Sequence, residues 1–463
     1  MTYYLAIDIG ASSGRHILSH VENGRICLEE IYRFPNGQRR DADGTLVWDT
    51  EALFSHVVAG ISMCKKLGRI PVSVGIDTWG VDFVLVDAEG KTVGKTVGYR
   101  DGRTEKSYEI IDAIVPPEEM YAHTGLQRQN FNTVCQLMAV RRDHPEWLER
   151  AESMLMMADY LHFRLTGARV SDYTNASTTQ LLNAAGRDWD RELIERLGLP
   201  GRIFLPLSAP GTTVGQLRGE IADEVGFDCN VVLPPTHDTA AAVAAVPGEG
   251  DNVLYISSGT WSLIGTELKA PVASEQARLL NWTNEGGYPD TIRFLKNIMG
   301  LWMIQEIKRE FDERGEVRSW SEIEAMAEES GCDELVDCDD RVFFAPESMC
   351  RAISEKVGRD DLTLGDYSRI VHRSLAARYA RACDEIEQLT GKKFDTLNIV
   401  GGGSKNGYLN RLTAAACGRR VLAGPTEGTA IGNLLVQMIA NGEFASLAEA
   451  RAAVGKSFGV VGY

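Results

Sequence analysis

The sequence predicts an α/β protein made of two similar domains with a catalytic cleft between them. Three observations support this prediction. The chain has 463 residues, which is too long for one comfortable hydrophobic core. Its composition, with 44% hydrophobic and 24% charged residues, is typical of a soluble α/β enzyme. Two segments far apart in the chain also share one pattern of strands and turns.

The first of these segments, "YYLAIDIGASSGRHIL", begins at Tyr3 and is typical of a β-hairpin. Its apolar residues predict a strand through Ile9, its small residues a turn over residues 10 to 14, and the remainder a second strand from Arg15. The segment "VLYISSGTWSLIG", residues 253 to 265, has the same order of elements. When Ile7 is aligned with Ile256, Gly10 falls on Gly259.

Each hairpin is followed by a long amphipathic helix and then by a strand that ends in small residues. In the first half, "TEALFSHVVAGISMCKKLG" precedes "VSVGIDTWG". In the second half, "YSRIVHRSLAARYARACDEIEQLTG" precedes "TLNIVGGGSKNG". A chance coincidence of two glycine-containing hairpins is the alternative, and the repeated order of elements favours a duplication instead.

The boundary between the halves is predicted in "AAVPGEGDN", residues 244 to 252, where Pro247 and two glycines end an alanine-rich helix. We therefore expect one domain over residues 1–246 and a second over residues 247–463, with Pro247 to Asn252 as part of a hinge. One small-residue turn from each half is expected to line the cleft, where ligands of such proteins bind.

The net charge of −17 limits the partners of the chain. Lys and Arg are scattered singly or in short pairs, which argues against nucleic acid and against an anionic membrane surface. An anionic substrate would be repelled by the long-range field of the protein. It must therefore be held by local backbone amides or by a metal ion.

The cysteines and the N-terminus favour a cytoplasmic protein. The nine cysteines are odd in number and contain no C-x-x-C pair, which is typical of reduced thiols rather than of disulfides or a zinc site. The start "MTYYLAIDIG" lacks a basic region, and no apolar run is long enough for a membrane span.

The small-residue turns are suited to binding phosphate. "GASSGR", residues 10 to 15, and "SSGT", residues 257 to 260, allow backbone amides to approach a phosphate closely. The three glycines of "IVGGGSKN", residues 399 to 406, offer bare backbone for a nucleotide base or ribose. Each pattern alone is more often an ordinary turn, but two facing turns are a stronger signal. The motifs of P-loop and dinucleotide-binding proteins are absent from the expected places.

Asp8 ends the first predicted strand immediately before a phosphate-binding turn. A carboxylate beside bound polyphosphate is repelled unless a cation intervenes, and Mg²⁺ is usually held by one or two carboxylates together with phosphate oxygens. We therefore expect Asp8 to bind Mg²⁺, most simply through water. A turn-capping role for Asp8 is the alternative.

These motifs resemble the FGGY family of carbohydrate kinases, within the actin, sugar kinase and heat-shock ATPase superfold. Among its members the chain is most similar to the rhamnulokinases, chiefly through "GIDTWGVDFVLVD" (75–87) and "IRFLKNIMGLWMIQE" (292–306). The resemblance implies two duplicated ribonuclease H-like (actin-like ATPase) domains. It also implies ATP-dependent phosphorylation of L-rhamnulose on its 1-hydroxyl in rhamnose breakdown, by a monomer or weak homodimer.

The resemblance also implies roles for individual residues. The catalytic base falls on Asp238 in "THDTAAAVAAVP". ATP contacts fall on Ala11, Ser12, Ser13, Gly14, Arg15, Thr260, Gln305 and Gly403, and sugar contacts fall on Gly80, His237, Asp238, Thr239 and Asn297.

Several alternatives remain open at this stage. His237 either donates to a sugar hydroxyl or only orients its loop, and Trp79 either flanks the sugar or belongs to the core. Asp82 and Asp101 either bind hydroxyls or cap turns. Two alternatives to an L-rhamnulose kinase are a kinase for another ketose, such as fuculose or xylulose, and a nucleotide-driven chaperone-like or filament protein.

Overall fold

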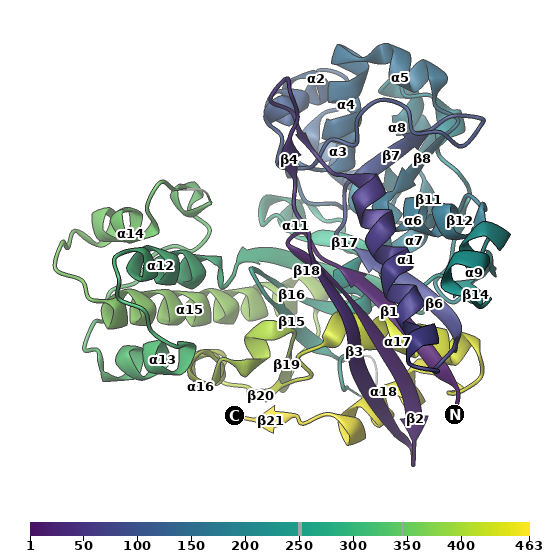
Figure 1. Ribbon diagram of the computed structural model, residues 1–463. Coiled ribbons are helices and arrows are strands. Elements are labelled where there is room, and N and C mark those ends of the chain that lie inside the picture. The colour runs from purple at the N-terminus through teal and green to yellow at the C-terminus, as the bar shows by residue number, and fades with distance from the viewer. Residues whose placement is uncertain (249–251, 345) are drawn as a thin grey trace. The chain divides into compact units, whose positions relative to one another are not determined.

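The computed structural model describes residues 1–248, 252–344 and 346–463 (Figure 1). Residues 249–251, in the middle of the predicted hinge, lie outside the described residues. The chain divides into two compact units. Unit 1 contains Met1–Pro247, Glu267–Phe294 and Gly428–Ser457, and unit 2 contains Gly248–Thr266, Leu295–Glu427 and Phe458–Tyr463.

The two units are not two continuous halves of the chain. The chain first leaves unit 1 after Pro247, close to the predicted boundary, but two later segments return to it. One of them carries helix α17 (Gly428–Ala440), whose buried apolar residues pack against strands of the first sheet. The predicted boundary between residues 246 and 247 divides the chain by sequence order and remains a prediction. The two compact units are instead defined by which residues pack together.

Unit 1 is built around a six-stranded sheet of order β13-β14-β6-β1-β2-β3. The central strand β1 (Tyr3–Ile9) is antiparallel to β2 (Ser13–Glu22) and parallel to β6 (Pro71–Thr78). The second strand of the hairpin therefore begins at Ser13, two residues before the predicted Arg15, because the turn is tighter than expected. The outer strands are β3 (Arg25–Pro35), β14 (Asn230–Val232) and β13 (Thr213–Gln216).

A second sheet of seven strands repeats this arrangement, with the order β17-β18-β16-β15-β19-β20-β21. Its strand β15 (Leu254–Ser258) is antiparallel to β16 (Trp261–Leu268) and parallel to β19 (Thr396–Val400). The orders β3-β2-β1-β6-β14 and β18-β16-β15-β19-β20 correspond strand for strand. The predicted duplication is confirmed. The other strands are β17 (Thr283–Gly286), β18 (Ile292–Met299), β20 (Arg420–Ala423) and β21 (Val461–Gly462).

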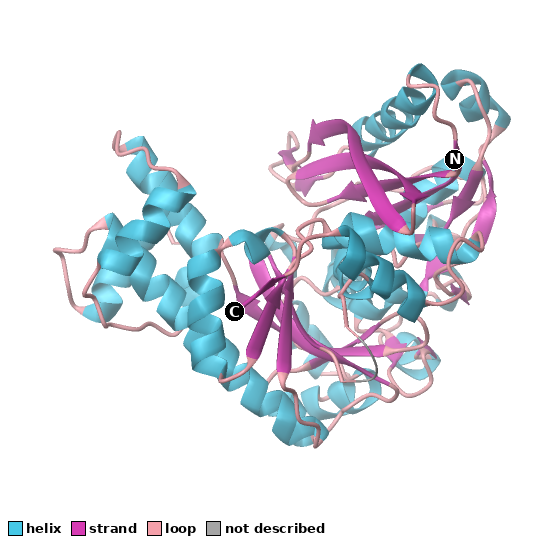
Figure 2. Ribbon diagram, turned by 90° about the horizontal axis from the view of Figure 1, so that it is seen from below, coloured by secondary structure: helices cyan, strands magenta, loops and turns pink. Residues whose placement is uncertain are grey.

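The two long predicted helices are present and are defined by their caps. Helix α1 (Thr50–Lys66) begins at Asp49, whose side chain accepts from the amide of Ala52, and its buried face includes Val57 and Ile61. Helix α15 (Leu364–Thr390) begins with a capping box at Thr363 and ends at Gly391, which has φ 69°. Figure 2 shows the strands in magenta with helices packed beside them.

Helix α10 (Asp238–Ala244) is the short alanine-rich helix that follows the "PPTH" loop. It packs closely against α17, and the closest approach is at Gly432. A methyl group at Gly432 would overlap the carbonyl oxygen of Ala241. This close contact of two helices fixes the position of α10, and therefore of Asp238 at its first turn.

The remaining elements surround these sheets. In unit 1 they are β4 (Arg39–Arg40), β5 (Leu46–Val47), β7 (Phe83–Val86), α2 (Ser107–Asp112), α3 (Pro117–Thr124), α4 (Thr133–Asp143), α5 (Pro145–Arg150), β8 (Ser153–Met156), α6 (Met157–Thr166), β9 (Ser171–Asp172), α7 (Tyr173–Ala176), β10 (Leu182–Asn183), β11 (Asp188–Trp189), α8 (Arg191–Arg196), β12 (Leu207–Ser208), α9 (Gly219–Val225), α11 (Glu275–Leu279) and α18 (Leu447–Ser457). In unit 2 they are α12 (Trp302–Glu313), α13 (Trp320–Glu329), α14 (Met349–Val357) and α16 (Gly407–Cys417).

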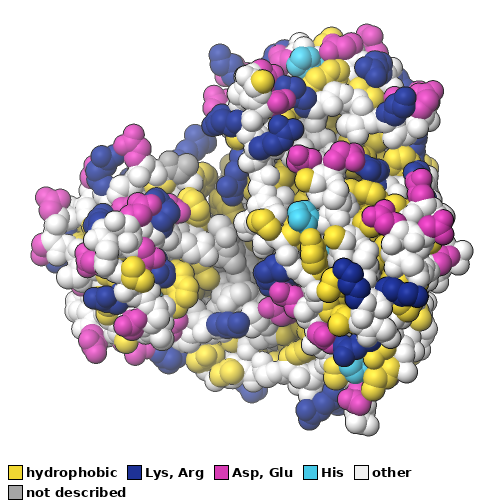
Figure 3. Space-filling model, in the orientation of Figure 1, with side chains coloured by type: hydrophobic (Ala, Val, Ile, Leu, Met, Phe, Trp, Pro, Cys, Tyr) yellow, Lys and Arg dark blue, Asp and Glu magenta, His cyan; other side chains and the backbone are white. Residues whose placement is uncertain are grey.

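The surface carries charged side chains of both signs. On the face shown in Figure 3, Lys and Arg side chains are mixed with Asp and Glu side chains. Among the described residues, no helix has both the length and the apolar character needed to cross a bilayer.

Candidate active site

Two carboxylates of unit 1, Asp77 and Asp238, have pKa values that are raised by burial and by the negative charge of Asp8. Asp8 lies near the end of β1, Asp77 lies opposite it on β6, and Asp238 begins α10. Burial raises the pKa of Asp77 well above its ordinary value, and the negative charges of Asp8 and Asp238 raise it further. Carboxylate oxygens are hard donors of the kind that Mg²⁺ prefers. The chemistry of Asp8 therefore fits the magnesium ion predicted beside it.

Asp8 also has a positively charged neighbour in the structure. Arg15, its partner across the hairpin, donates from Nε at 3.0 Å and from Nη2 at 2.8 Å to the same oxygen, Oδ2. The ion pair joins the predicted metal-binding residue to one of the predicted ATP-binding residues. It also places a negative charge on β1 and a positive charge on β2, beside the turn that joins them.

Asp77 is held by the polar face of α17. The side-chain amide of Asn433 donates to Asp77 Oδ2 at 2.6 Å and to the carbonyl of Gly75 at 3.1 Å. Gln437, one turn later, donates to Asn433 Oδ1 at 2.7 Å and to the carbonyl of Leu5 at 3.0 Å. The other oxygen of Asp77 is buried without a hydrogen-bond partner among the described residues. Helix α17 thus orients a carboxylate that the sequence did not single out.

Asp238 is the most accessible of the three carboxylates, with a third of its side chain exposed. Its Oδ1 atom accepts from the amide of Thr239 at 2.5 Å and from the Thr239 hydroxyl at 3.1 Å. Burial raises the pKa of Asp238; His237 opposes that shift, and the charge of Asp8 adds to it. A carboxylate with a raised pKa is a better proton acceptor.

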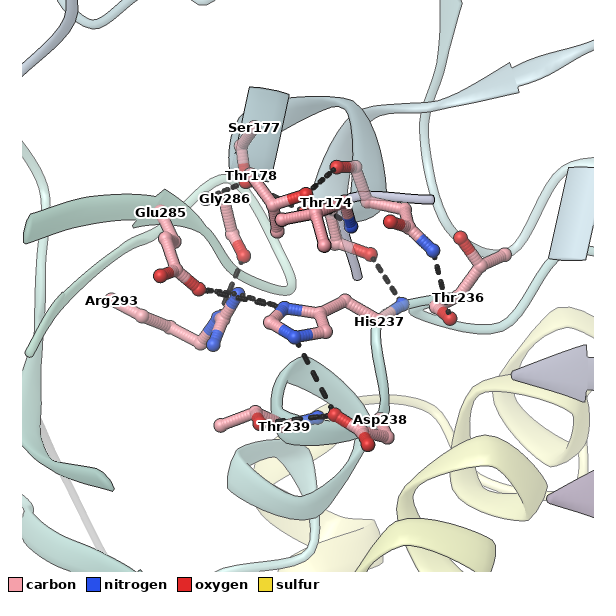
Figure 4. A network of polar contacts seen from close by, with 12 residues as sticks. Thr174, Ser177, Thr178, Thr236, His237, Asp238, Thr239, Glu285, Gly286 and Arg293 are labelled. Carbon is pink, nitrogen blue, oxygen red and sulfur yellow. Dashed lines mark hydrogen bonds and ion pairs between the residues drawn. The ribbon is translucent and has the colours of Figure 1, made fainter. Parts of the chain in front are cut away.

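His237 is at the centre of a buried polar network (Figure 4). Its Nε2 atom lies 3.4 Å from Asp238 Oδ1, and its Nδ1 atom lies 3.1 Å from Nη2 of Arg293. The same Nη2 atom donates to Oε2 of Glu285 at 3.0 Å. Burial alone would raise the pKa of Glu285, but Arg293 and then His237 lower it below its ordinary value.

Gly80 lies beside this histidine. A methyl group at Gly80 would come within 3.3 Å of His237 Nε2 and within 3.2 Å of the Thr178 hydroxyl. The next residue, Val81, has φ 68°, a conformation that costs energy for a β-branched residue. The amide of Val81 donates to the hydroxyl of Thr178. The carbonyl of Val81 accepts from the side chains of Thr133 and Gln136. Strain of this kind is typical of functional sites.

Two acids whose roles the sequence left open have protein partners in the structure. Asp82 is buried, and its Oδ2 atom accepts from the indoles of Trp48 at 2.6 Å and Trp79 at 3.0 Å. Trp79 is therefore a core residue whose ring lies 4.1 Å from that of Trp48. Asp101 caps a short 3-10 turn by accepting from the amide of Arg103.

The predicted ATP-binding residues of unit 1 lie in the turn between β1 and β2 and on the first residues of β2. The amide of Gly10 donates to the carbonyl of Ser13 at 2.9 Å, and Ser12 is exposed. Gly14 is buried, and a methyl group there would overlap the ring of Phe34. The other members of the predicted set in unit 1 are Ala11 and Arg15.

Unit 2 brings its three predicted ATP-binding residues into one neighbourhood. Thr260 lies in the β15–β16 turn, and its carbonyl accepts from the amide of Trp302 at the start of α12. Gln305 lies one turn later on α12. Gly403 is packed against the Ser258 side chain, where a methyl group would not fit. Asn297, predicted to contact the sugar, lies on β18 within unit 2.

Sequence reasoning missed Glu285, Arg293 and Asp77. Glu285 lies in "NEGG" and Arg293 in the apolar strand "IRFLKNIM", both of which support the family resemblance. A charged residue inside an apolar strand was a usable signal, because charges are rarely buried without a partner. Asp77 follows an apolar strand in the same way.

Comparison with known proteins gives matches over most of the chain. The family model for the N-terminal domain of the FGGY family of carbohydrate kinases matches residues 3–245, and the model for its C-terminal domain matches residues 254–441. A rhamnulokinase from Oceanobacillus iheyensis is 44% identical over 99% of this chain and 97% of its own length. A rhamnulokinase from Bacillus subtilis is 41% identical over 98% of this chain and 94% of its own.

Solved structures confirm the predicted fold class. A ligand-bound xylulose kinase from Lactobacillus acidophilus has a TM-score of 0.81 at 15% identity, covering 100% of this chain and 94% of that one. Glycerol kinase from Plasmodium falciparum with ADP has a TM-score of 0.78 at 14% identity, covering 99% and 94%. With the repeated strand order, these matches establish two duplicated actin-like ATPase domains, and the chain belongs to the FGGY family of carbohydrate kinases.

Proposed function

We propose that this protein is a rhamnulokinase, which transfers the γ-phosphoryl group of ATP to the 1-hydroxyl of L-rhamnulose and yields L-rhamnulose 1-phosphate and ADP. The observation that supports the substrate is the identity of 37% to 44% to seven curated rhamnulokinases, each over at least 98% of this chain. The proposed role is a step in the breakdown of L-rhamnose.

Asp238 is the proposed catalytic base. Phosphoryl transfer through a loose transition state requires alignment, charge neutralisation and a group that accepts the hydroxyl proton. A carboxylate is a weak base for a free alcohol, but the hydroxyl becomes strongly acidic as its oxygen bonds to phosphorus. The raised pKa of Asp238 and its partial exposure support this role, since the group must both accept a proton and reach a substrate.

The sugar is proposed to contact Gly80, His237, Asp238, Thr239 and Asn297. Gly80 and His237 are close enough that a side chain on Gly80 would crowd the imidazole. The absence of that side chain leaves room for a substrate beside Nε2. The strained backbone at Val81 supports the proposal that this loop is shaped for binding.

ATP is proposed to contact the β1–β2 turn through Ala11, Ser12, Ser13, Gly14 and Arg15, and the second neighbourhood through Thr260, Gln305 and Gly403. Asp8 is proposed to hold Mg²⁺, directly or through water, and that ion would neutralise charge on the phosphates. Arg15 pairs with Asp8 and adds a positive charge at the same turn. A cytoplasmic monomer or weak homodimer is the expected form of the enzyme.

The deciding experiment is ADP production measured with L-rhamnulose, with other ketoses, and without sugar. The proposal expects turnover that depends on sugar and is fastest with L-rhamnulose. Faster turnover of fuculose or xylulose would show that the enzyme prefers that ketose to L-rhamnulose. ADP production at the same rate without sugar would instead indicate a nucleotide-driven binding protein.

A further inference from the structure

We propose that Arg293 and Glu285 are positioning residues that hold His237 as the tautomer with its proton on Nε2, the nitrogen that faces Asp238. This inference rests on the proposed function, because it gives the pair a task in preparing the base for the sugar hydroxyl. Neither residue is predicted to contact substrate.

The first step of the argument is the contact between Arg293 and His237. The Nη2 atom of Arg293 lies 3.1 Å from Nδ1 of His237. A guanidinium group carries only donors, so Nδ1 must be the acceptor in this hydrogen bond. A neutral imidazole has one proton, and that proton is then on Nε2.

The second step is that Arg293 is fixed in place. Its side chain is fully buried, Nε donates to the carbonyl of Gly286 at 2.7 Å, and Nη2 donates to Glu285 at 3.0 Å. Nη2 has two hydrogens, so it can donate one to Glu285 and the other to His237. Glu285 also balances the charge of the buried guanidinium, which would otherwise be costly.

The alternative tautomer is disfavoured by the same atoms. Glu285 Oε2 lies 3.4 Å from Nδ1, so a proton on Nδ1 could point at this carboxylate. It would, however, oppose the hydrogen of Arg293 that approaches Nδ1 at the shorter distance.

The third step links the tautomer to the base. The proton on Nε2 faces Asp238 Oδ1 at 3.4 Å, and Oδ1 already accepts from Thr239. These donors all converge on one oxygen. Oδ2 receives no hydrogen bond from the described residues, so it is the oxygen left to accept the substrate proton.

The test combines a spectroscopic signature with kinetics. In the full chain labelled with ¹⁵N-histidine, imidazole nitrogen shifts report the protonated nitrogen, and His237→Gln identifies the signal of His237. We expect Nε2 protonated and Nδ1 bare in the unaltered protein. Arg293→Met should move the signal toward a mixture and lower kcat with L-rhamnulose at least about 10-fold, with KM for ATP unchanged.

Conservative variants and a control separate positioning from folding. Arg293→Lys keeps one donor and should retain more of the signal and of kcat than Arg293→Met, and Glu285→Gln should fall between them. Arg278→Met removes a surface arginine that pairs with Glu275 in the same part of unit 1 and should change neither readout.

The unaltered protein decides the proposal even if Arg293→Met does not fold. A proton on Nδ1 of His237 would overturn it, as would an Arg293→Met variant whose spectrum and kcat match those of the unaltered protein. A failure of the proposed function looks different, because L-rhamnulose would then not be phosphorylated by the unaltered protein whichever tautomer the spectrum reports.

Discussion

The β1–β2 hairpin of unit 1 and the β15–β16 hairpin of unit 2 share one backbone plan but differ in chemistry. In each, the glycine that opens the turn donates its amide across the turn at 2.9 Å, from Gly10 to Ser13 and from Gly259 to Trp261. In unit 1 the strand carries Asp8 opposite Asp77, whereas in unit 2 the corresponding Ser257 lies opposite Val400. Charge is therefore concentrated in one copy of the duplicated scaffold.

The surroundings of the two turns differ in the opposite sense. Around the unit 2 turn, Gly300, Gly401 and Gly403 are so tightly packed that a methyl group on any of them would overlap neighbouring atoms. Around the unit 1 turn, a methyl group on Gly10 would meet only the Ser13 carbonyl at 3.6 Å, whereas one on Gly14 would overlap the ring of Phe34. The first copy thus supplies the titratable groups, and the second supplies the larger number of tightly packed glycines.

The largest expected effect tests whether chemistry is confined to unit 1. Asp238→Asn should lower kcat by at least about 10²-fold, because the amide cannot accept the hydroxyl proton, while L-rhamnulose and ATP still bind. The measurement is a coupled ADP assay together with calorimetric binding of both substrates. Ser257→Ala, at the position in unit 2 that aligns with Asp8, is the control and should keep kcat within a few-fold. Normal turnover by Asp238→Asn would remove this residue from the role of base.

A second change tests whether unit 1 also needs a glycine where two helices are in close contact. Gly432→Ala should destabilise the protein by about 1 to 3 kcal/mol, since its methyl group would overlap the Ala241 carbonyl and push α17 away from α10. Gly455→Ala is the matched control in helix α18, where a methyl group meets nothing within 4 Å. It should stabilise the helix by roughly 0.5 to 1 kcal/mol. Thermal unfolding of both variants measures the difference, and equal shifts would contradict the packing argument.

A third change tests the role of close approach in unit 2. Gly403→Ala should cost about 1 to 2 kcal/mol and raise KM for ATP, because the new methyl group displaces the Ser258 side chain. The adjacent Gly402→Ala has open space and should leave both quantities nearly unchanged. If the two variants behave alike, the glycines serve chain flexibility and not packing.

Local patterns in the sequence were sufficient for the duplicated elements. The hairpins, the helices α1 and α15, and the strands β6 and β19 follow from apolar spacing, caps and glycines within a few residues. These signals are local, so no knowledge of the rest of the chain was needed. The same holds for the small-residue turns, whereas the role of Asp238 was an expectation from the family resemblance.

Long-range packing was not accessible in the same way. No local pattern indicates that residues 428–457 return to unit 1, because an apolar helix can cover either sheet. Asn433 therefore could not be identified as the partner of Asp77, which is far from it in the chain. Arg293 and Glu285 reach His237 only because β17 and β18 bring them there, although a buried arginine in an apolar strand was visible as an anomaly.

The last expected effect concerns acid stability and the strand that carries Asp77. The amide of Ile76 in β6 donates to Nε2 of His162 at 3.0 Å, and burial lowers the pKa of His162 to about 3. In the unfolded chain a histidine takes up its proton near pH 6.5. Between these values the unfolded state binds more protons, so the free energy of unfolding decreases as the pH falls through this window.

His162→Gln should make this decrease less steep, by at most about 1.4 kcal/mol per pH unit, because glutamine can still accept from Ile76 but does not titrate. Urea unfolding at several pH values between 4 and 7 measures the slope, which remains informative if the variant is less stable at every pH. His144→Gln is the control, since that residue lies on the surface. In unit 2, burial lowers the pKa of His372 to about 4, so His372→Gln should also reduce the slope. An unchanged slope in His162→Gln with a reduced slope in His372→Gln would locate the acid-sensitive step in unit 2, away from the strand that carries Asp77.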